Sequence, residues 1–269
     1  MLSHPRIIAG LRQKLAFPPG SAACRRRAST GAPGADRALG GGLITNALHE
    51  VYAASGWDAA AASGFSAGLA LRAARGRPVI WIFQEMFELE AGRPNGPGLK
   101  EFGLDPARAV FVRARDAAAA LRAGAEAARS PAAGAVILAL WGAPAALDLT
   151  ASRRLALAAE TSGATLILLR AAAEPEPSAA LTRWRISALP SRGLEADAPG
   201  TPAFNAALTR QRGGVSGLAW RLEWNRDQQC FDERRGSFMP AAEPALPRAQ
   251  FPLPQRGAGD AAERFRKAG

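Results

Sequence analysis

The sequence predicts an α/β protein whose sheet is mainly parallel, is flanked by helices on both faces and gains antiparallel strands at its C-terminal end. Between residues 47 and 170, apolar runs of strand length alternate with segments of helix length, which is typical of a parallel sheet. After residue 181, three strand-like runs follow one another without helices between them, so these strands are expected to be antiparallel. With 269 residues, the chain is long enough to bury one large core.

The elements of the parallel part follow from hydrophobic periodicity and from residues that begin or end helices. Asp58 and Asp116 are each placed to cap the helix that follows, and Gly163 is placed to end one. Three glycines at 40–42 precede the first strand and indicate a tight turn. The expected strands are 47–53, 77–83, 109–113, 133–141 and 164–170, and the expected helices are 33–39, 58–74, 99–104, 117–129 and 149–163.

The chain divides into three segments by composition. Residues 1–28 contain a helix at 5–16, with apolar residues at helical spacing, and then a basic linker. Residues 29–225 form the α/β domain, whose last two strands are expected to pair as an antiparallel hairpin. The expected strands at its end are 182–190, 204–214 and 217–224. Residues 226–269 are rich in proline and poor in apolar periodicity, so we expect a mostly disordered tail.

The formal net charge is +11, and much of the excess lies in two parts of the chain. Residues 1–27 contain six basic residues and no acidic one, and residues 181–226 contain seven arginines against three acids. This distribution fits a nucleic-acid or other polyanionic partner, and equally a solvated basic surface. No apolar run approaches the about 20 residues of a membrane span, and the N-terminal bases precede no signal-peptide core. We therefore expect a cytoplasmic protein without a membrane partner.

A strand, a loop of small residues and a helix at 47–74 make the frame in which many nucleotide-binding proteins hold a phosphate. Beyond this frame, three blocks of sequence resemble the ImuA family of RecA-like proteins. The blocks are STGAPGADRALGGGL with ALHEVYA, LTASRRLALAAETSGATLILLR, and TRWRISALPS followed by RQRGG and WRLEW. The resemblance covers roughly residues 5–225 and implies a RecA-like core for residues 29–225. The related SulA-type division inhibitors share that core.

The resemblance also implies a function. ImuA proteins belong to bacterial inducible-mutagenesis cassettes, where they work with ImuB, a catalytically inactive relative of Y-family polymerases, and with an error-prone polymerase of the replicative type. We therefore expect a non-catalytic adaptor of DNA-damage-induced (SOS) mutagenesis and translesion synthesis, associated with the nucleoid after damage. RecA and DNA are further candidate partners. A SulA-like inhibitor of cell division is an alternative, although SulA-type proteins are shorter.

The loop before the long helix lacks the residues that a phosphate-binding loop requires. Such a loop needs glycines, a lysine for the β- and γ-phosphates and a hydroxyl for Mg²⁺. In alignment with the RecA pattern, Gly56 remains nearby, but Asp58, Ala59 and Ala60 stand at the second glycine, the lysine and the hydroxyl. An aspartate that faces a phosphate at ~4 Å repels it by about 4 kcal/mol at an effective dielectric of ~20. We therefore expect no bound ATP and no other cofactor.

The other catalytic positions are degenerate in part. Leu140 stands where the magnesium-binding strand of the RecA core ends in an acid, whereas Glu85 stands where that core keeps the glutamate that activates water. Without a bound triphosphate Glu85 has nothing to activate, so we expect a vestigial carboxylate. His49 and Glu50 invite a metal site, but neighbouring strand residues point to opposite faces and no second histidine is near. We expect neither an enzyme nor a metal site.

Five arginines in the C-terminal strands are candidate contacts to DNA or to a protein partner: Arg183, Arg185, Arg210, Arg212 and Arg221. Because alternate residues of a strand face one side, Arg183 and Arg185 are expected to lie side by side, as are Arg210 and Arg212. Such rows can follow a phosphate backbone. A direct single-stranded DNA-binding module is therefore the second hypothesis, and it is compatible with an adaptor.

Overall fold

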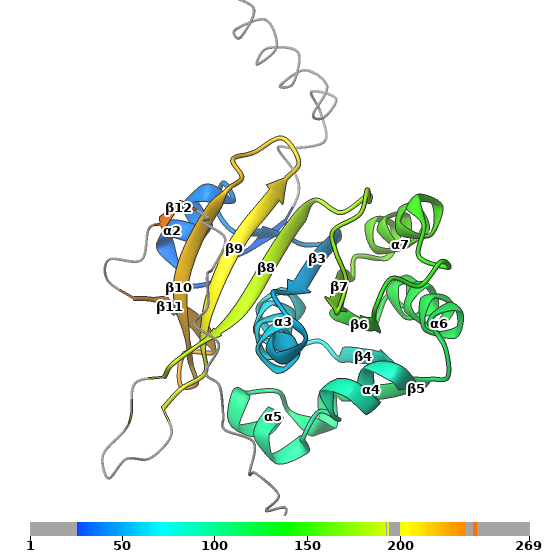
Figure 1. Cartoon of the computed structure of the whole chain (residues 1–269), viewed down its shortest axis with the longest axis horizontal. Coiled ribbons are helices and arrows are strands. Elements are labelled where there is room, and N and C mark those ends of the chain that lie inside the picture. The colour runs from blue at the N-terminus through cyan, green and yellow to red at the C-terminus, as the bar shows by residue number, and fades with distance from the viewer. Residues whose placement is uncertain (1–25, 192, 194–199, 235–238, 241–269) are drawn as a thin grey trace, which may run out of the picture.

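The computed structural model describes residues 26–191, 193, 200–234 and 239–240 (Figure 1). Within these residues the chain forms a ten-stranded mixed sheet flanked by helices, and a second sheet of two short strands. No helix in this described part is long and apolar enough to cross a bilayer. The helix expected at 5–16 lies outside the described residues, as does the expected tail from residue 241 onward.

The elements alternate between strand and helix up to β7 and are strands thereafter. The strands are β1 (Arg27–Ala28), β2 (Leu43–Ile44), β3 (Leu48–Ala53), β4 (Val79–Gln84), β5 (Ala109–Ala114), β6 (Ala135–Trp141), β7 (Thr165–Ala171), β8 (Thr182–Leu189), β9 (Ala203–Gln211), β10 (Leu218–Asn225), β11 (Cys230–Glu233) and β12 (Met239–Pro240). The helices are α2 (Pro33–Ala38), α3 (Ala59–Ala74), α4 (Glu85–Ala91), α5 (Gly96–Phe102), α6 (Ala117–Arg129) and α7 (Leu149–Ser162), with the 3₁₀ turns η1 (Gly56–Asp58) and η2 (Pro106–Arg108).

The large sheet is parallel in one half and antiparallel in the other, as the sequence predicts. Its strands lie in the order β11-β10-β9-β8-β3-β7-β6-β4-β5, and β12 also pairs with β10. β3 pairs in parallel with both β7 and β8. The antiparallel half begins where β9 pairs with β8, and β10 continues it as the expected hairpin partner of β9. The fold class is therefore confirmed, with β3 at the centre of the sheet.

Helices cover both faces of the parallel half. α3 packs along one face, and α6 and α7 cover the opposite face. In Figure 1, α6 and α7 lie beside β6 and β7, away from α3. β4 shows both environments, because Trp81 and Phe83 belong to the core on the α3 side and Ile82 to the core on the α6 side. The inner parallel strands are thus buried on both faces, which explains their continuous apolar runs, whereas the edge strand β5 leaves Val110 and Phe111 exposed.

Local sequence determines several helix ends. Asp116 and Asp148 each accept a hydrogen bond of 2.7 Å from the backbone N–H three residues on, and so cap α6 and α7. Gly163 ends α7 with a φ of 87°, a conformation that glycine adopts without strain. Asp58, by contrast, makes no side-chain hydrogen bond that caps α3, so that expectation is wrong.

Strand β11 lies at the start of the segment 226–269, for which the sequence analysis assigns no strand. It pairs antiparallel with β10, and its Phe231 is fully buried, 5.0 Å from the ring of Phe65 in α3. A strand of four residues is too short for periodicity to detect, and pairing with β10 determines its place. The sequence analysis also assigns no structure to the two-residue strands β1 and β2 or to the seven-residue helix α4.

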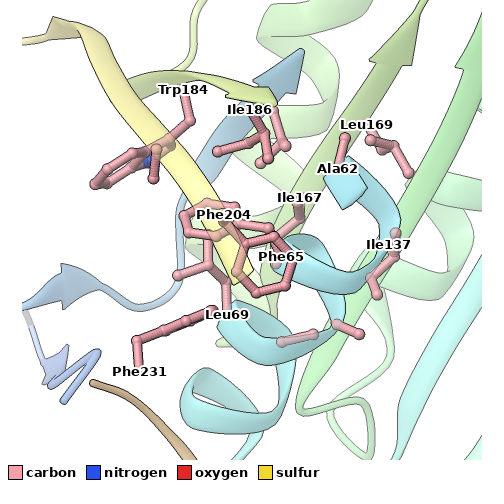
Figure 2. Packing of buried hydrophobic residues seen from close by; sticks show 14 of the residues in the cluster. Ala62, Phe65, Leu69, Ile137, Ile167, Leu169, Trp184, Ile186, Phe204 and Phe231 are labelled. Atoms are coloured by element: carbon pink, nitrogen blue, oxygen red, sulfur yellow. The ribbon is translucent and has the colours of Figure 1, made fainter. Parts of the chain in front are cut away.

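An aromatic cluster packs the antiparallel half of the sheet onto α3 (Figure 2). Between ring centroids, Phe65 of α3 lies 5.5 Å from Trp184 of β8. Phe204 of β9 lies 6.0 Å from both Phe65 and Phe231 in edge-on arrangements. Aromatic pairs of this kind contribute about 0.5–1.5 kcal/mol each beyond the area that they bury. The cluster therefore joins three strands of the antiparallel half to the helix that serves the parallel half.

Two glycines of α3 are predicted to respond in opposite ways to alanine. A Cβ at Gly68 would lie 2.8 Å from Trp224 and closer still to Phe231, so Gly68→Ala should lower the free energy of unfolding by about 1–3 kcal/mol. A Cβ at Gly64 would meet Phe204 at 3.5 Å, an ordinary contact. Gly64→Ala should therefore raise the free energy of unfolding by about 0.5–1 kcal/mol, because alanine favours the helix more than glycine does. Urea denaturation measures both values, and a Gly68→Ala variant as stable as Gly64→Ala would contradict this packing.

Candidate functional site

The loop between β3 and α3 is the candidate phosphate site, and Asp58 fastens it to β8. Asp58 is only 6% exposed. Its carboxylate accepts hydrogen bonds from Ser55 Oγ at 2.6 Å and from the backbone N–H of Ala188, in β8, at 2.8 Å. The carboxylate is therefore buried and hydrogen-bonded between loop and strand.

Further hydrogen bonds hold the same loop to β8. Ala54 N donates to Ile186 O at 2.8 Å, and Arg185 Nη2 donates to Ala54 O at 3.0 Å. Asp58 N donates to Ser55 O at 3.1 Å. A phosphate-binding loop must leave its N–H groups for the ligand. Here the N–H groups of Ala54 and Asp58 have acceptors within the protein.

The other loop positions differ in exposure. Ala59, at the position of the lysine, is buried in the core on the α3 side, whereas Gly56 and Ala60 are exposed. Trp57 lies in η1 and is 98% exposed. The loop thus presents a large aromatic side chain beyond the carboxyl end of β3.

Of the two remaining catalytic positions, one holds Glu85, which is ion-paired, and the other holds Leu140, which is buried in the core. Glu85 begins α4, and its Oε1 lies 2.5 Å from Nη2 of Arg113 in β5. Arg113 also pairs with Glu88 through Nε at 2.9 Å. Leu140 is fully buried in the core beneath α6 and α7. Glu85 therefore belongs to a half-exposed ion-pair network between α4 and β5.

His49 is a buried core histidine. Its Nε2 lies 2.7 Å from Ile44 O, and its Nδ1 lies 2.7 Å from Thr182 Oγ1. Because a carbonyl oxygen only accepts, Nε2 donates to Ile44, and in the neutral ring Nδ1 accepts from Thr182. Burial lowers the pKa of His49 from 6.5 to about 4, against the hydrogen bond to Ile44, which raises it. Among the described residues no group of three or more His, Cys, Asp or Glu could hold a metal ion.

Arg183, Arg185 and Arg210 gather on one face of β8 and β9. Arg183 Nε donates to Glu50 Oε2 of β3 at 2.7 Å, and both side chains are largely buried. A β-bulge between β8 and β9 places Arg210 opposite Arg183. Burial, and after it the positive charge of Arg183, lower the pKa of Arg210. The expected arginine row forms, but a buried carboxylate compensates the charge of Arg183.

Arg212 lies close enough to Arg210 for its charge to lower the pKa of Arg210 further, whereas Arg221 lies on β10. Arg212 follows the end of β9, where its backbone N–H donates to Leu181 O at 2.8 Å. Arg210 and Arg212 are therefore close enough for their charges to interact, although only Arg210 lies within β9. Arg221 is an exposed residue of β10, opposite Asn205 of β9.

A second group of arginines, which the sequence analysis does not single out, lies at the amino ends of the parallel strands. Arg72 and Arg75 come from the end of α3, Arg77 follows the next turn, and Arg26 precedes β1. Arg75 lines two hollows, of about 360 and 320 Å³. The sequence Arg72–Arg77, with three arginines in six residues, is the pattern that could have indicated them.

Comparison with known proteins decides the family. The chain is 36% identical over 211 residues to protein ImuA of Caulobacter vibrioides (strain NA1000 / CB15N), and the alignment covers 72% of this chain and 82% of that relative. The chain belongs to the ImuA family. Protein ImuA of C. vibrioides (strain ATCC 19089 / CIP 103742 / CB 15) gives the same values. No protein-family model matches the chain. Membership of the ImuA family confirms the resemblance found in the sequence.

Asp58→Ala is predicted to lower the free energy of unfolding by about 2 kcal/mol, because it removes a buried acceptor from Ser55 and Ala188. Ser55→Ala removes one donor and leaves the bond to Ala188, so it should cost less, about 0.5–1.5 kcal/mol. Asp58→Asn keeps an acceptor oxygen, so its loss in the free energy of unfolding should lie between the losses of Ser55→Ala and Asp58→Ala. Urea denaturation gives the order, and an Asp58→Ala variant as stable as the parent protein would contradict the described geometry.

Proposed function

We propose that the protein is a non-catalytic, RecA-like adaptor of DNA-damage-induced (SOS) mutagenesis. It links an ImuB-type protein and an error-prone polymerase during translesion synthesis. Membership of the ImuA family supports the mutagenesis role, and it favours that role over inhibition of cell division. RecA is a further candidate partner, and the protein acts in the cytoplasm, at the nucleoid after damage.

The Asp58 contact is the observation that carries the non-catalytic part of the proposal. A triphosphate in this loop would approach a buried carboxylate and would need N–H groups that already have acceptors. Separating the carboxylate from its donors costs about 1–3 kcal/mol for each group left unpaired. Repulsion between the carboxylate and a phosphate adds about 4 kcal/mol at ~4 Å and an effective dielectric of ~20. The loop therefore serves as a structural joint between β3, α3 and β8.

Trp57 is the side chain that we assign to the contact with the ImuB-type protein. It is 98% exposed, and the described structure gives it no packing role. Met86 at the start of α4 and Leu149 at the start of α7 are also exposed and follow the carboxyl ends of β4 and β6. Parallel strands bring their carboxyl ends to one edge of the sheet, so these apolar residues share an edge with Trp57. Tryptophan is enriched among residues that dominate binding energy at protein interfaces.

Trp57→Ala is predicted to weaken capture of an ImuB-type protein by the tagged full-length chain at least about tenfold, because an interface tryptophan typically contributes about 2 kcal/mol or more. The matched control is Leu157→Ala, on the outer side of α7, where Leu157 is 60% exposed. The control should bind as the parent protein does. Thermal unfolding of both variants verifies that the fold is intact. If the parent chain does not bind an ImuB-type protein at all, the adaptor proposal fails.

Titration with Mg-ATP is predicted to give no saturable binding up to about millimolar nucleotide, a free energy of binding weaker than about 4 kcal/mol. Isothermal calorimetry with the full chain measures this directly. Asp58→Asn serves as the control, because it removes the charge while keeping an acceptor for Ala188. Saturable micromolar binding by the parent protein would overturn the non-catalytic assignment and leave the adaptor assignment to the capture experiment.

Direct binding of single-stranded DNA is the second candidate function. The gathering of Arg183, Arg185 and Arg210 on one sheet face favours it. The buried pair of Arg183 and Glu50 weighs against it, because this charge is already compensated inside the protein. The binding experiment described below separates this face from a second basic surface.

A further inference from the structure

Six arginines lie near the C-terminal end of α3, and we call them the amino-edge patch: Arg26, Arg27, Arg72, Arg75, Arg77 and Arg108. The Arg27 side chain bonds the turn after α2 and lines neither of the two hollows described below. A helix that follows a strand in a parallel sheet runs back along it, so the end of α3 lies at the amino ends of the strands. β1, the end of α3, the loop before β4 and the residues before β5 supply these side chains. The patch therefore lies at the edge opposite Asp58 and Trp57.

Backbone carbonyl groups hold five of these arginines in place. Arg72 Nε donates to Ser29 O at 2.8 Å, and Arg75 Nη2 donates to Arg27 O at 2.6 Å. Similar bonds join Arg27 Nη1 to Gly42 O at 3.1 Å, Arg77 Nη2 to Gly163 O at 3.1 Å, and Arg108 Nη1 to Gly76 O at 2.7 Å. A carbonyl oxygen fixes a guanidinium without neutralising its charge. The patch therefore combines fixed geometry with formal positive charge.

Carboxylates are scarce around this patch. In the described part of the chain, an ion pair between a patch arginine and a carboxylate is present only for Arg108, with Asp105 at 3.8 Å. Arg113 and Arg183, elsewhere on the sheet, each have a carboxylate within 3 Å. The C-terminal end of a helix carries about −0.5 charge, so the ends of α3 and α7 together offset about one of the six positive charges. The negative charge at the helix ends is therefore too small to explain why six arginines gather here.

Arginine and other polar side chains line two hollows within the patch. The hydroxyls among them, of Ser29, Thr45 and Ser162, already donate to Asp36 or to backbone carbonyl groups. The first hollow, of about 360 Å³, is lined by Ser29, Arg72, Arg75, Gln228 and Gln229 together with small residues and Leu71. The second, of about 320 Å³, shares Arg75 and adds Arg26, Arg77, Thr45, Asn46 and Ser162. Neither lining includes an Asp or Glu from the described residues. Each hollow is large enough for a phosphate group, and Arg75 lies between them.

We propose that the amino-edge patch binds the phosphodiester backbone of nucleic acid without reading the bases. Arginine binds phosphate through two parallel N–H groups, and fixed guanidiniums lose little freedom when they do so. The linings contain no aromatic side chain, so stacking with bases is not expected. They also contain no exposed large apolar residue of the kind that forms the core of a protein interface, which argues against an acidic protein. This inference does not depend on the adaptor proposal.

The test is fluorescence anisotropy of the full chain with a labelled oligothymidine and, in a parallel arm, a labelled duplex. Arg26→Glu is the cleanest variant, because the Arg26 side chain has no hydrogen bond or ion pair within the described residues. Arg75→Gln with Arg77→Gln removes two further charges. We expect the three substitutions together to weaken binding at least about tenfold. For each phosphate that is no longer neutralised, the slope of log affinity against log salt should also fall by about 0.7 on single strands or about 0.9 on duplex.

A matched control makes the same change of net charge at three exposed arginines elsewhere: Arg122→Glu on α6, with Arg153→Gln and Arg154→Gln on α7. The control variant should keep most of its affinity for DNA. If it loses as much affinity as the amino-edge variant, net charge alone explains the loss and the proposal is wrong. Arg210→Gln with Arg212→Gln tests the β8–β9 face. If that variant loses binding while the amino-edge variants keep it, the proposal is wrong. Absent binding by the parent chain, or stronger binding of polyglutamate than of DNA, would also overturn it. Thermal unfolding confirms that each variant is folded.

Capture of an ImuB-type protein separates this proposal from the adaptor proposal. In nuclease-treated solution the amino-edge variants should capture that partner as the parent chain does, since Trp57 lies at the other edge of the sheet. Loss of DNA binding with intact capture supports both proposals. Intact DNA binding in the variants overturns this one alone.

Discussion

The fold depends on the packing of one helix, α3, against both halves of the sheet. Its small residues let it lie close to β3, β6 and β7, while Phe65 receives Trp184, Phe204 and Phe231 from the antiparallel half. α5 adds a smaller contact on that face, where Phe102 stacks on Trp224 of β10 with ring centroids 4.5 Å apart. Gly68 is glycine because two aromatic rings occupy the space of its side chain. Alanine and glycine in α3 therefore reflect this close approach.

The two ends of α3 have opposite electrostatic character. At its start, where a phosphate-binding loop would place ligand beside the positive end of the helix dipole, the chain buries the carboxylate of Asp58. At its end, Arg72 and Arg75 donate to the carbonyl groups of Ser29 and Arg27, and the arginines nearby exceed the charge needed to balance the dipole. The basic surface thus lies at the edge opposite the one where a phosphate-binding loop would hold nucleotide. The proposed contact with an ImuB-type protein and the proposed contact with nucleic acid therefore use surfaces at opposite ends of α3.

The sequence predicts features that depend on neighbouring residues and fails where distant residues decide. Continuous apolar runs identify the parallel strands, and Asp116 caps its helix as predicted, because the N–H that it binds lies three residues away. Asp58 has the same local context, but its partner Ala188 lies 130 residues further on, so the side chain turns to β8. Glu50 likewise binds Arg183 from 133 residues away. The ImuA resemblance supplies the family, which neither periodicity nor charge contains.

The position of β3 has a consequence for the order of folding. β3 is the first strand of the large sheet in the sequence, yet it hydrogen-bonds only to β7 and β8 within the described sheet, and their residues follow much later. The bond between His49 and Thr182 spans 133 residues. The central strand therefore has no partner strand until most of the chain has left the ribosome. Contacts between residues so far apart in sequence slow folding, and until they form, the unpaired strand can associate with other chains. Synthesis of this protein should therefore depend on chaperones more than the synthesis of a helical protein of equal size does.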